Sequence, residues 1–417
     1  RKTVLVRWET TPDDLSGMIA AEGILTSHGG KTSHAAVIAR GMGAPCVCGV
    51  EALKIDAEKK EAAIAGTDIV IKEGDVISID GMTGEVMLGA VELEEPEMTG
   101  DLGKLLEWAD KYRKLGVRAN ADNPDDAKLS RDMGAEGIGL CRTEHMFLGD
   151  RKQIVADMIL AEKGGEAYNE ALDKLYELQQ GDYYEMLKAM DGLPVIIRLL
   201  DPPLHEFVPH DLAGQQTMAE EMGLTVSEIQ KRVDSLSEHN PMLGHRGCRL
   251  GNTYPEITEM QTRAILGAAV QLKKEGFNPE PEIMVPLIGI VNEFDMQEEV
   301  IRSTAKKIFE EAGVEVEFKV GTMIEIPRAA LTAGYIAKKA EYFSFGTNDL
   351  TQMTFGYSRD DIASFLPVYL DKKILKVDPF QVLDQTGVGQ LIEMAVENGR
   401  KTRPTLTCGI CGEHGGE

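Results

Sequence analysis

A histidine stands at the start of an alanine-rich stretch, directly after two glycines, a lysine and two hydroxyl residues. The run HGGKTSHAAVIARGMG covers residues 28–43, and within it Thr32 and Ser33 precede His34. The glycines allow the main chain to approach an anion closely. A hydroxyl cap, the free N–H groups of the first helical turn and the helix dipole all favour negative charge there. An imidazole can accept a phosphoryl group covalently. We therefore expect His34 to carry a phosphoryl group, and not merely to form a structural hydrogen bond at the start of the helix.

A second set of reactive side chains lies near the ends of apolar runs or in the loops beside them. The set comprises Arg142, Arg198, Arg246, Glu325, Asn348, Asp349 and Cys411. Two carboxylates are hard oxygen ligands of the kind that Mg²⁺ takes, and guanidinium groups bind phosphoryl oxygens through paired hydrogen bonds. A single Arg or Glu at a strand end is usually a solvated rim residue or part of a salt bridge. Together, however, these groups suit one phosphorylated anion and predict phosphoryl transfer by placement and charge neutralisation.

Cys408 and Cys411 have the C-x-x-C spacing of redox and zinc sites. The sequence holds no second C-x-x-C pair to complete a zinc site, and His414 alone is not enough. A thioredoxin-like motif is expected early in a βαβ unit, whereas this pair lies in a late strand. A proton donor therefore fits Cys411 better.

Composition sets limits on the class of protein. With 417 residues, 43% hydrophobic and 27% charged, the chain should form two or three globular domains. A net charge of −25 argues against nucleic acid or an anionic membrane as the main partner. We find no signal peptide and no apolar run long enough to cross a bilayer. Six scattered cysteines favour a reducing, cytoplasmic compartment.

The pattern of apolar runs predicts an α/β protein with two domains. Residues 1–90 contain short strands, a helix near His34 and a meander over 68–88. An acidic, proline-containing segment at 91–101 is the expected linker. Residues 102–417 alternate strands with long helices, as a TIM-type (β/α)₈ barrel does. The seven predicted strands are 117–122, 137–144, 194–201, 282–288, 318–327, 342–349 and 404–411.

Two further expectations concern the barrel domain. The stretches 157–190 and 202–280 are longer than ordinary connections, so we expect them to be insertions. The eighth strand should lie past Glu417, so the barrel lacks its last strand and both chain ends are expected to be cut from a longer protein.

These motifs resemble those of a known family. The segment GILTSHGGKTSHAAVIARGMGAPCVCG resembles the phosphohistidine segment of the PEP-utilising enzymes, with Lys31 where Met or Arg is usual. The runs GIGLCRTEHMF, IIRLLDPPLHEF, NPMLGHRGCRLG, TMIEIPRAAL, FSFGTNDLTQMTFGYSRDD and CGICGEHGG resemble the PEP/pyruvate domain of the pyruvate phosphate dikinases. The ending CGEHGG and the segment HRGCRLG favour that group over PEP synthases and over enzyme I of the sugar phosphotransferase system.

The resemblance implies a role for each matching position. It implies that His34 carries the phosphoryl group and that Cys411 is the proton donor. It implies that Glu325 and Asp349 bind Mg²⁺ beside the substrate. The implied substrate contacts are Arg142, Arg198, Arg246, Glu325, Gly346, Thr347, Asn348 and Asp349. Thr32 matches the threonine at which the plant enzymes of the group are regulated.

The resemblance also implies a reaction and its partners. The complete protein would convert ATP, phosphate and pyruvate into AMP, pyrophosphate and PEP, and this chain would hold the PEP/pyruvate half. ATP, AMP and phosphate would bind through a domain that precedes residue 1. The family is commonly dimeric, and the His34 domain would swing on the linker between two sites. PEP synthase, enzyme I and a non-catalytic fragment that only displays phosphohistidine remain as alternatives.

Overall fold

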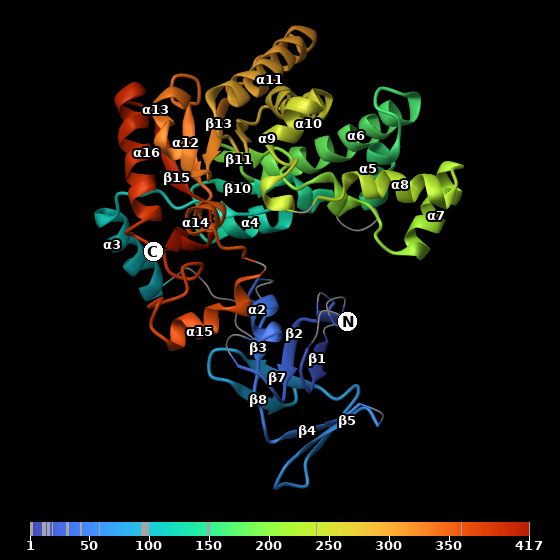
Figure 1. Cartoon of the computed structure of the whole chain (residues 1–417). Coiled ribbons are helices and arrows are strands. Elements are labelled where there is room, and N and C mark those ends of the chain that lie inside the picture. The colour runs from blue at the N-terminus through green and yellow to red at the C-terminus, as the bar shows by residue number, and fades with distance from the viewer. Residues whose placement is uncertain are drawn as a thin grey trace. The chain divides into compact units, whose positions relative to one another are not determined.

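The computed structural model describes residues 3–10, 14, 17–18, 20–30, 33–41, 44–57, 59–92, 100–147, 151–238, 240–359 and 361–416. The chain divides into two compact units, Arg1–Lys104 and Leu105–Glu417, each of which is described by itself (Figure 1). None of the described helices is both long and apolar enough to cross a lipid bilayer.

The first unit is built from short strands and one described helix. Its elements are β1 (Val4–Arg7), β2 (Gly23–Thr26), α2 (His34–Gly41), β3 (Cys46–Val47), β4 (Leu53–Asp56), β5 (Glu61–Ile64), β6 (Val70–Lys72), β7 (Ile77–Asp80) and β8 (Glu85–Leu88). Strands β1, β2 and β3 form a parallel sheet, β4, β5 and β6 an antiparallel one, and β7 and β8 a hairpin. Helix α2 packs Ala35 and Ala39 against Ile24 of β2 and Met18.

The prediction of one meander over residues 68–88 is wrong. Strand β6 pairs with β5, whereas β7 and β8 pair with each other in a separate sheet. Ile71 of β6 is buried with Leu53 of β4 and Ala62 of β5. This shared burial explains why β6 pairs with β5. Alternation of apolar and polar residues indicates which face of a strand is buried, but it does not identify the neighbouring strand.

The second unit alternates helices and strands. Its strands are β9 (Ala119–Asn120), β10 (Ile138–Arg142), β11 (Pro194–Arg198), β12 (Glu280–Val285), β13 (Lys319–Ile324), β14 (Tyr342–Phe345) and β15 (Thr407–Ile410). Its helices are α3 (Gly100–Tyr112), which spans the division between the units, α4 (Pro124–Asp132), α5 (Lys152–Leu160), α6 (Glu166–Ala189), α7 (Leu212–Met222), α8 (Val226–Leu236), α9 (Cys248–Thr253), α10 (Pro255–Lys274), α11 (Val291–Ala312), α12 (Pro327–Leu331), α13 (Ala333–Ile336), α14 (Thr347–Phe355), α15 (Leu366–Asp371) and α16 (Val388–Thr402).

The seven strands of this unit form one parallel sheet that curls into a partial barrel. They follow chain order from β9 to β15, and each pairs with its neighbours. This confirms the predicted α/β barrel-type fold with seven strands. One interior cluster contains the side chains of Leu140, Ile196, Met284, Met323, Tyr342 and Cys411. Among the described residues no strand joins β15 to β9, but the Asn120 amide donates to the Cys411 carbonyl across 3.3 Å.

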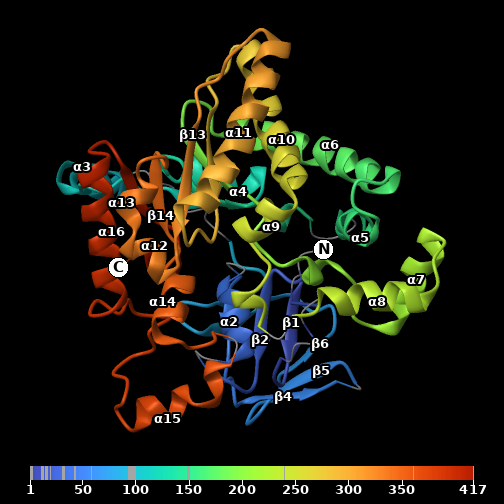
Figure 2. The same ribbon diagram turned by 45° about the horizontal axis from the view of Figure 1, so that its top comes forward.

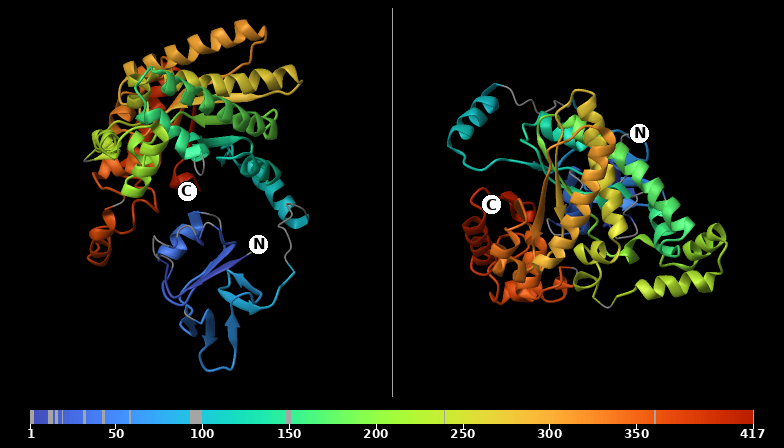
Figure 3. Two further views of the ribbon diagram at one scale, coloured as in Figure 1. Left: turned by 90° about the vertical axis from the view of Figure 1, so that its right-hand side faces the viewer. Right: turned by 90° about the horizontal axis from the view of Figure 1, so that it is seen from above.

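Helices α6 and α10 are covering helices rather than insertions, so that expectation is wrong for both. Helix α6 lies against α10, and α10 lies against α11 (Figure 3). Twelve side chains of α10 are buried because neighbouring helices and the sheet surround it. The additional segments are α5, α7 and α8, which lie at the end of the unit away from α16 (Figure 2) and enclose a small core of their own.

Candidate active site

The predicted groups lie at one end of the curled sheet. Arg142 and Arg198 are register partners at the ends of β10 and β11. Glu325 directly follows β13, Gly346 follows β14 and Cys411 follows β15. The carboxyl ends of parallel barrel strands form the rim where chemistry is usually placed. The structure therefore brings together residues that lie far apart in the sequence.

A buried chain of alternating charges runs along this rim. Arg198 forms an ion pair with Glu144, and its Nη1 lies 3.3 Å from Asp201 Oδ2. Arg246 donates from Nη2 to the same Asp201 oxygen at 2.8 Å and from Nη1 to Asp349 Oδ1 at 3.2 Å. Asp201 therefore holds both guanidinium groups. Both arginines, which the sequence predicts as phosphoryl contacts, are paired with carboxylates in the structure.

Burial and pairing act against each other on Asp201. Burial raises the pKa of its carboxyl. The guanidinium groups of Arg198 and Arg246 lower that pKa by a larger amount, so the net pKa lies below its usual value. Asp201 Oδ1 and both Nε atoms of the arginines are buried without a hydrogen-bond partner in the described part of the chain. Burying polar atoms without partners costs free energy, and these three atoms could still form hydrogen bonds with a polar ligand.

A second pair holds Arg142 at the edge of the rim. Its Nη2 donates to Asp122 Oδ2 at 2.6 Å, and its main-chain N–H donates to Asp122 Oδ1 at 2.8 Å. His145 Nδ1 lies 2.8 Å from the same carboxylate. Burial raises the pKa of Asp122, but hydrogen bonds from His145 and Arg142 outweigh it and bring that pKa well below its usual value.

Glu325 and Asp349 form the candidate cation site. Glu325 is fully buried, and its Oε1 accepts from the Leu287 N–H at 2.7 Å, while Oε2 has no partner in the described part of the chain. Burial and the charges of Asp349 and Asp201 raise the pKa of Glu325 to about 8. A Cβ on Gly346 would lie 2.5 Å from Glu325 Oε2, so only glycine leaves that space.

The charge balance of the rim fits a divalent cation. Its carboxylates are Asp122, Glu144, Asp201, Glu325 and Asp349, and its guanidinium groups are Arg142, Arg198 and Arg246. Five carboxylates against three guanidinium groups leave an excess of two negative charges when all are ionised. The described residues contain no group of three His, Cys, Asp or Glu side chains that could hold a metal alone. Two carboxylates that share Mg²⁺ with substrate and water fit this arrangement.

Cys411 lies inside the rim with its thiol protonated. Its side chain is buried, its N–H donates to the Phe345 carbonyl at 3.2 Å, and its Sγ lies 3.6 Å from the same oxygen. Burial raises the pKa of the thiol to about 11, even though a hydrogen bond with Ser344 acts in the opposite direction. A neutral thiol at physiological pH is able to donate a proton.

His414 alone does not complete a zinc site, but in the structure its ring joins two segments of the rim. Its Nε2 lies 3.1 Å from the Pro379 carbonyl, which can only accept, so in the neutral imidazole Nδ1 accepts from the Thr347 hydroxyl at 2.9 Å. A Cβ on Gly412 would lie 2.1 Å from that hydroxyl, so the turn packs tightly against Thr347. The Glu413 N–H also donates to Asn348 Oδ1 at 3.2 Å. These contacts fix the turn after Cys411 to the predicted substrate residues.

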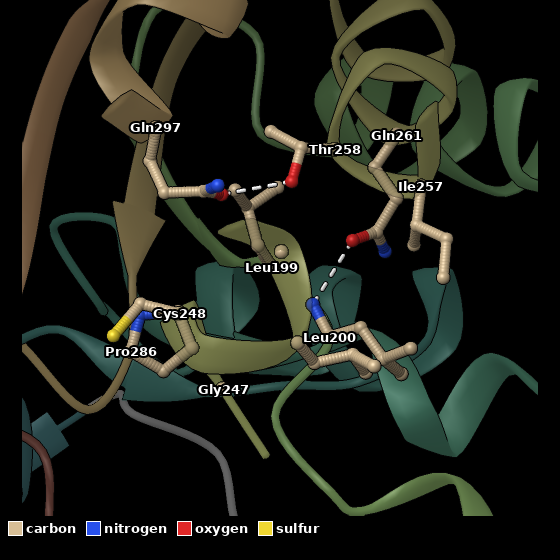
Figure 4. A pocket seen from close by; sticks show the side chains of 11 residues that line it. Leu199, Leu200, Gly247, Cys248, Ile257, Thr258, Gln261, Pro286 and Gln297 are labelled. Carbon is tan, nitrogen blue, oxygen red and sulfur yellow. Dashed lines mark hydrogen bonds between the residues drawn. The ribbon is translucent and has the colours of Figure 1, made fainter. Parts of the chain in front are cut away.

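A small cavity of about 10 Å³ lies beside the segments that carry Asp201 and Arg246 (Figure 4). Gln261 Oε1 accepts from the Leu200 N–H at 2.9 Å, and Thr258 donates to Gln297 at 2.8 Å. A space of this size holds at most about one water molecule. The cavity is therefore too small to bind substrate.

In the first unit the structure describes only part of the predicted phosphohistidine site. Helix α2 begins at His34, and Ser33 Oγ accepts from the Ala36 N–H at 3.4 Å in the manner of a cap. Gly29 has φ +107°, a conformation that favours glycine. The side chain of His34, together with Lys31 and Thr32, lies outside the described residues.

Comparison with known proteins defines the class. Residues 1–84 match the mobile domain of PEP-utilising enzymes, and residues 96–417 match their PEP-binding domain. The chain therefore belongs to the PEP-utilising enzyme family, as its motifs predict.

Two curated relatives illustrate the similarity. The chain is 57% identical over 420 residues to pyruvate, phosphate dikinase 1, chloroplastic, of Arabidopsis thaliana. It is 54% identical over 418 residues to pyruvate, phosphate dikinase of Clostridium symbiosum. Both alignments cover 100% of this chain but 43% and 48% of the relatives. The chain thus spans a little under half the length of the curated relatives it matches.

Proposed function

We propose that this chain catalyses the PEP/pyruvate half of a dikinase reaction, in which PEP gives its phosphoryl group to His34 and leaves as pyruvate. The observation that carries the proposal is the rim on which two buried arginines, the carboxylates of Glu325 and Asp349 and a buried thiol converge. The names of the relatives support the same reaction. By extension, the whole protein would join this half to ATP, AMP and phosphate chemistry.

The arginines would position the phosphoryl group. Arg142, Arg198 and Arg246 each carry five donors, and only part of that capacity is used by carboxylates. The unpartnered Nε atoms of Arg198 and Arg246 provide donors for phosphoryl oxygens. Placement and charge neutralisation are the main requirements of phosphoryl transfer, so these contacts would lower the barrier to attack by the His34 imidazole.

Glu325 and Asp349 would hold Mg²⁺, and Gly346 leaves the space beside Glu325 open. When bound, the cation would supply Lewis-acid stabilisation to the substrate oxygens. Burial, with the charges of Asp349 and Asp201, raises the pKa of Glu325 to about 8, so Glu325 would hold the ion as a carboxylate only when the charge repulsion is offset.

Cys411 would complete the reaction by protonating the methylene carbon of the enolate. Its buried thiol retains the proton that this step consumes, because burial raises its pKa to about 11. In the reverse direction the thiolate would remove a methyl proton from pyruvate. His414 would hold the Cys411 turn and the Thr347–Asn348 segment in register.

The domain boundaries and the wider partners belong to the same proposal. Residues 1–90 would form the mobile domain and would move on the segment 91–101 relative to residues 102–417, since one histidine has to serve two reactions. Thr32 would be the position at which phosphorylation could control His34. A dimeric assembly and a reducing compartment such as the cytoplasm complete the proposal, and free cysteines at all six positions are compatible with that compartment.

Labelled PEP tests the proposal. The chain is incubated with Mg²⁺ and PEP that carries label in its phosphoryl group. The protein is then digested, and the labelled peptide and residue are identified by mass spectrometry. We expect an acid-labile label on His34, no label in His34→Ala, and full label in His210→Ala, which changes an exposed histidine. Unlabelled protein, or label that persists in His34→Ala, would contradict the proposal; the former would favour a non-catalytic fragment.

A further inference from the structure

Two thiols of the first unit face each other beside the start of α2. Cys46 opens β3 and Cys48 lies two residues further along, so both side chains project from the same face of the strand. Their Sγ atoms are 3.2 Å apart, and both cysteines are half-buried and free. A disulfide requires about 2.05 Å between the sulfurs, so a shift of little more than 1 Å would bring these two into bonding range.

The pair is connected to the turn that precedes His34. Ser33 Oγ donates to Cys48 Sγ at 3.7 Å and also accepts from the Ala36 N–H at 3.4 Å. A Cβ on Gly49 would lie 2.5 Å from the Gly29 carbonyl oxygen, so the chain after Cys48 packs directly on the glycine turn. Movement of Cys48 would therefore be transmitted to the helix cap and to the turn.

We propose that Cys46 and Cys48 form a dithiol site that is reversibly oxidised by small disulfides of the glutathione class, and that its oxidation weakens the Ser33 cap and slows phosphorylation of His34. The bond itself depends only on the contacts of the two cysteines. Its consequence for His34 rests on the proposed function.

The oxidation proceeds in two balanced exchange steps. The Cys48 thiolate attacks one sulfur of the oxidant, a Cys48–glutathione disulfide forms, and one glutathione thiolate leaves. Cys46 then attacks the Cys48 sulfur, the Cys46–Cys48 bond forms, and its proton passes to the second departing glutathione. Two electrons thus move from the protein dithiol to glutathione disulfide, which becomes two glutathione thiols. The first attack is assigned to Cys48 because the Ser33 hydroxyl donates to Cys48 Sγ, whereas burial raises the pKa of Cys46.

The bond is tested by mass spectrometry of the full chain equilibrated in buffers of defined ratios of reduced to oxidised glutathione. Free thiols are trapped with N-ethylmaleimide, and the peptide that contains residues 46–48 is examined. We expect it to lose two hydrogen atoms, to resist alkylation in oxidising buffers and to recover with dithiothreitol. Thiols that alkylate at every ratio, or a single glutathione adduct without the internal bond, would overturn the site.

The consequence is tested in the same samples by the rate of phosphohistidine formation from labelled PEP. We expect oxidation to slow phosphorylation about fivefold, which is the rate factor that corresponds to the free energy of one helix cap. Cys46→Ser should abolish the response to oxidation, because Cys48 then has no thiol at position 46 with which to form the internal bond, whereas Cys408→Ser should respond like the unmodified chain. An unchanged rate in fully oxidised protein would overturn the link to α2. If even reduced protein is not phosphorylated, the proposed function fails, while the mass readout still decides the dithiol site.

Discussion

Asp201 is the residue on which the rim network depends most, because among the described residues it is the carboxylate that contacts both Arg198 and Arg246. Asp201→Asn keeps the shape of the side chain but removes its charge. Breaking a buried ion pair from one side costs about 3–5 kcal/mol. Each arginine retains a second carboxylate, Glu144 or Asp349, so we expect the lower end, about 3 kcal/mol.

Scanning calorimetry of the unit Leu105–Glu417 within the full chain measures this effect. With an unfolding entropy of about 2.1 cal/mol/K per residue, the expected loss lowers Tm by about 5 °C. Asp173→Asn, which changes an exposed carboxylate on α6, is the matched control and should stay within about 0.5 kcal/mol.

A double-mutant cycle separates the ion pair from other effects of the change. Asp201 and Arg246 are 2.8 Å apart, so Asp201→Asn and Arg246→Met should be non-additive by about 1–3 kcal/mol. Additive losses, or an Asp201→Asn protein as stable as the control, would refute the view that Asp201 holds the arginines.

Three further changes probe the rest of the rim. Cys411→Ser should slow the exchange of pyruvate methyl protons with solvent by about 100-fold or more while PEP still binds, and Cys408→Ser serves as its control; equal rates by NMR would exclude the thiol as proton donor. His414→Leu should lower the rate of pyruvate–PEP exchange about tenfold with partial recovery in His414→Gln, whereas a change in stability alone would reduce His414 to a structural role. Asp122→Asn should lose about 2 kcal/mol at pH 7. Because the folded-state pKa of Asp122 lies below its usual 3.8, its contribution is present above about pH 4 and disappears as the pH falls through the folded value, and a penalty that persists in acid would contradict this linkage.

The strands of the second unit were predictable because most of them are apolar runs that end in a polar group. Arg142 and Arg198 follow that rule, and the register pairs them side by side. Asp122 and Asp201 follow it as well, but affinity for a phosphorylated anion does not predict them. Their role is to neutralise the arginines, and it becomes clear only from the ion pairs that the folded chain forms.

Other features could not be derived from local pattern. The partner of β6 depends on the burial of Ile71 with residues of β4 and β5, which alternation does not encode. Segment length alone predicts insertions at α6 and α10, whereas their contacts with each other and the core that they share with the strands show that they cover the sheet. The role of His414 depends on Thr347 and Pro379, which are distant in sequence.

Isotope exchange between pyruvate and PEP tests the central claim most directly. The chain is mixed with Mg²⁺, PEP and carbon-labelled pyruvate, without nucleotide, and the label in PEP is measured over time. A reversible transfer between PEP and His34 predicts that the label enters PEP, and that His34→Ala abolishes the exchange. Label confined to pyruvate under conditions in which PEP demonstrably binds would contradict the account.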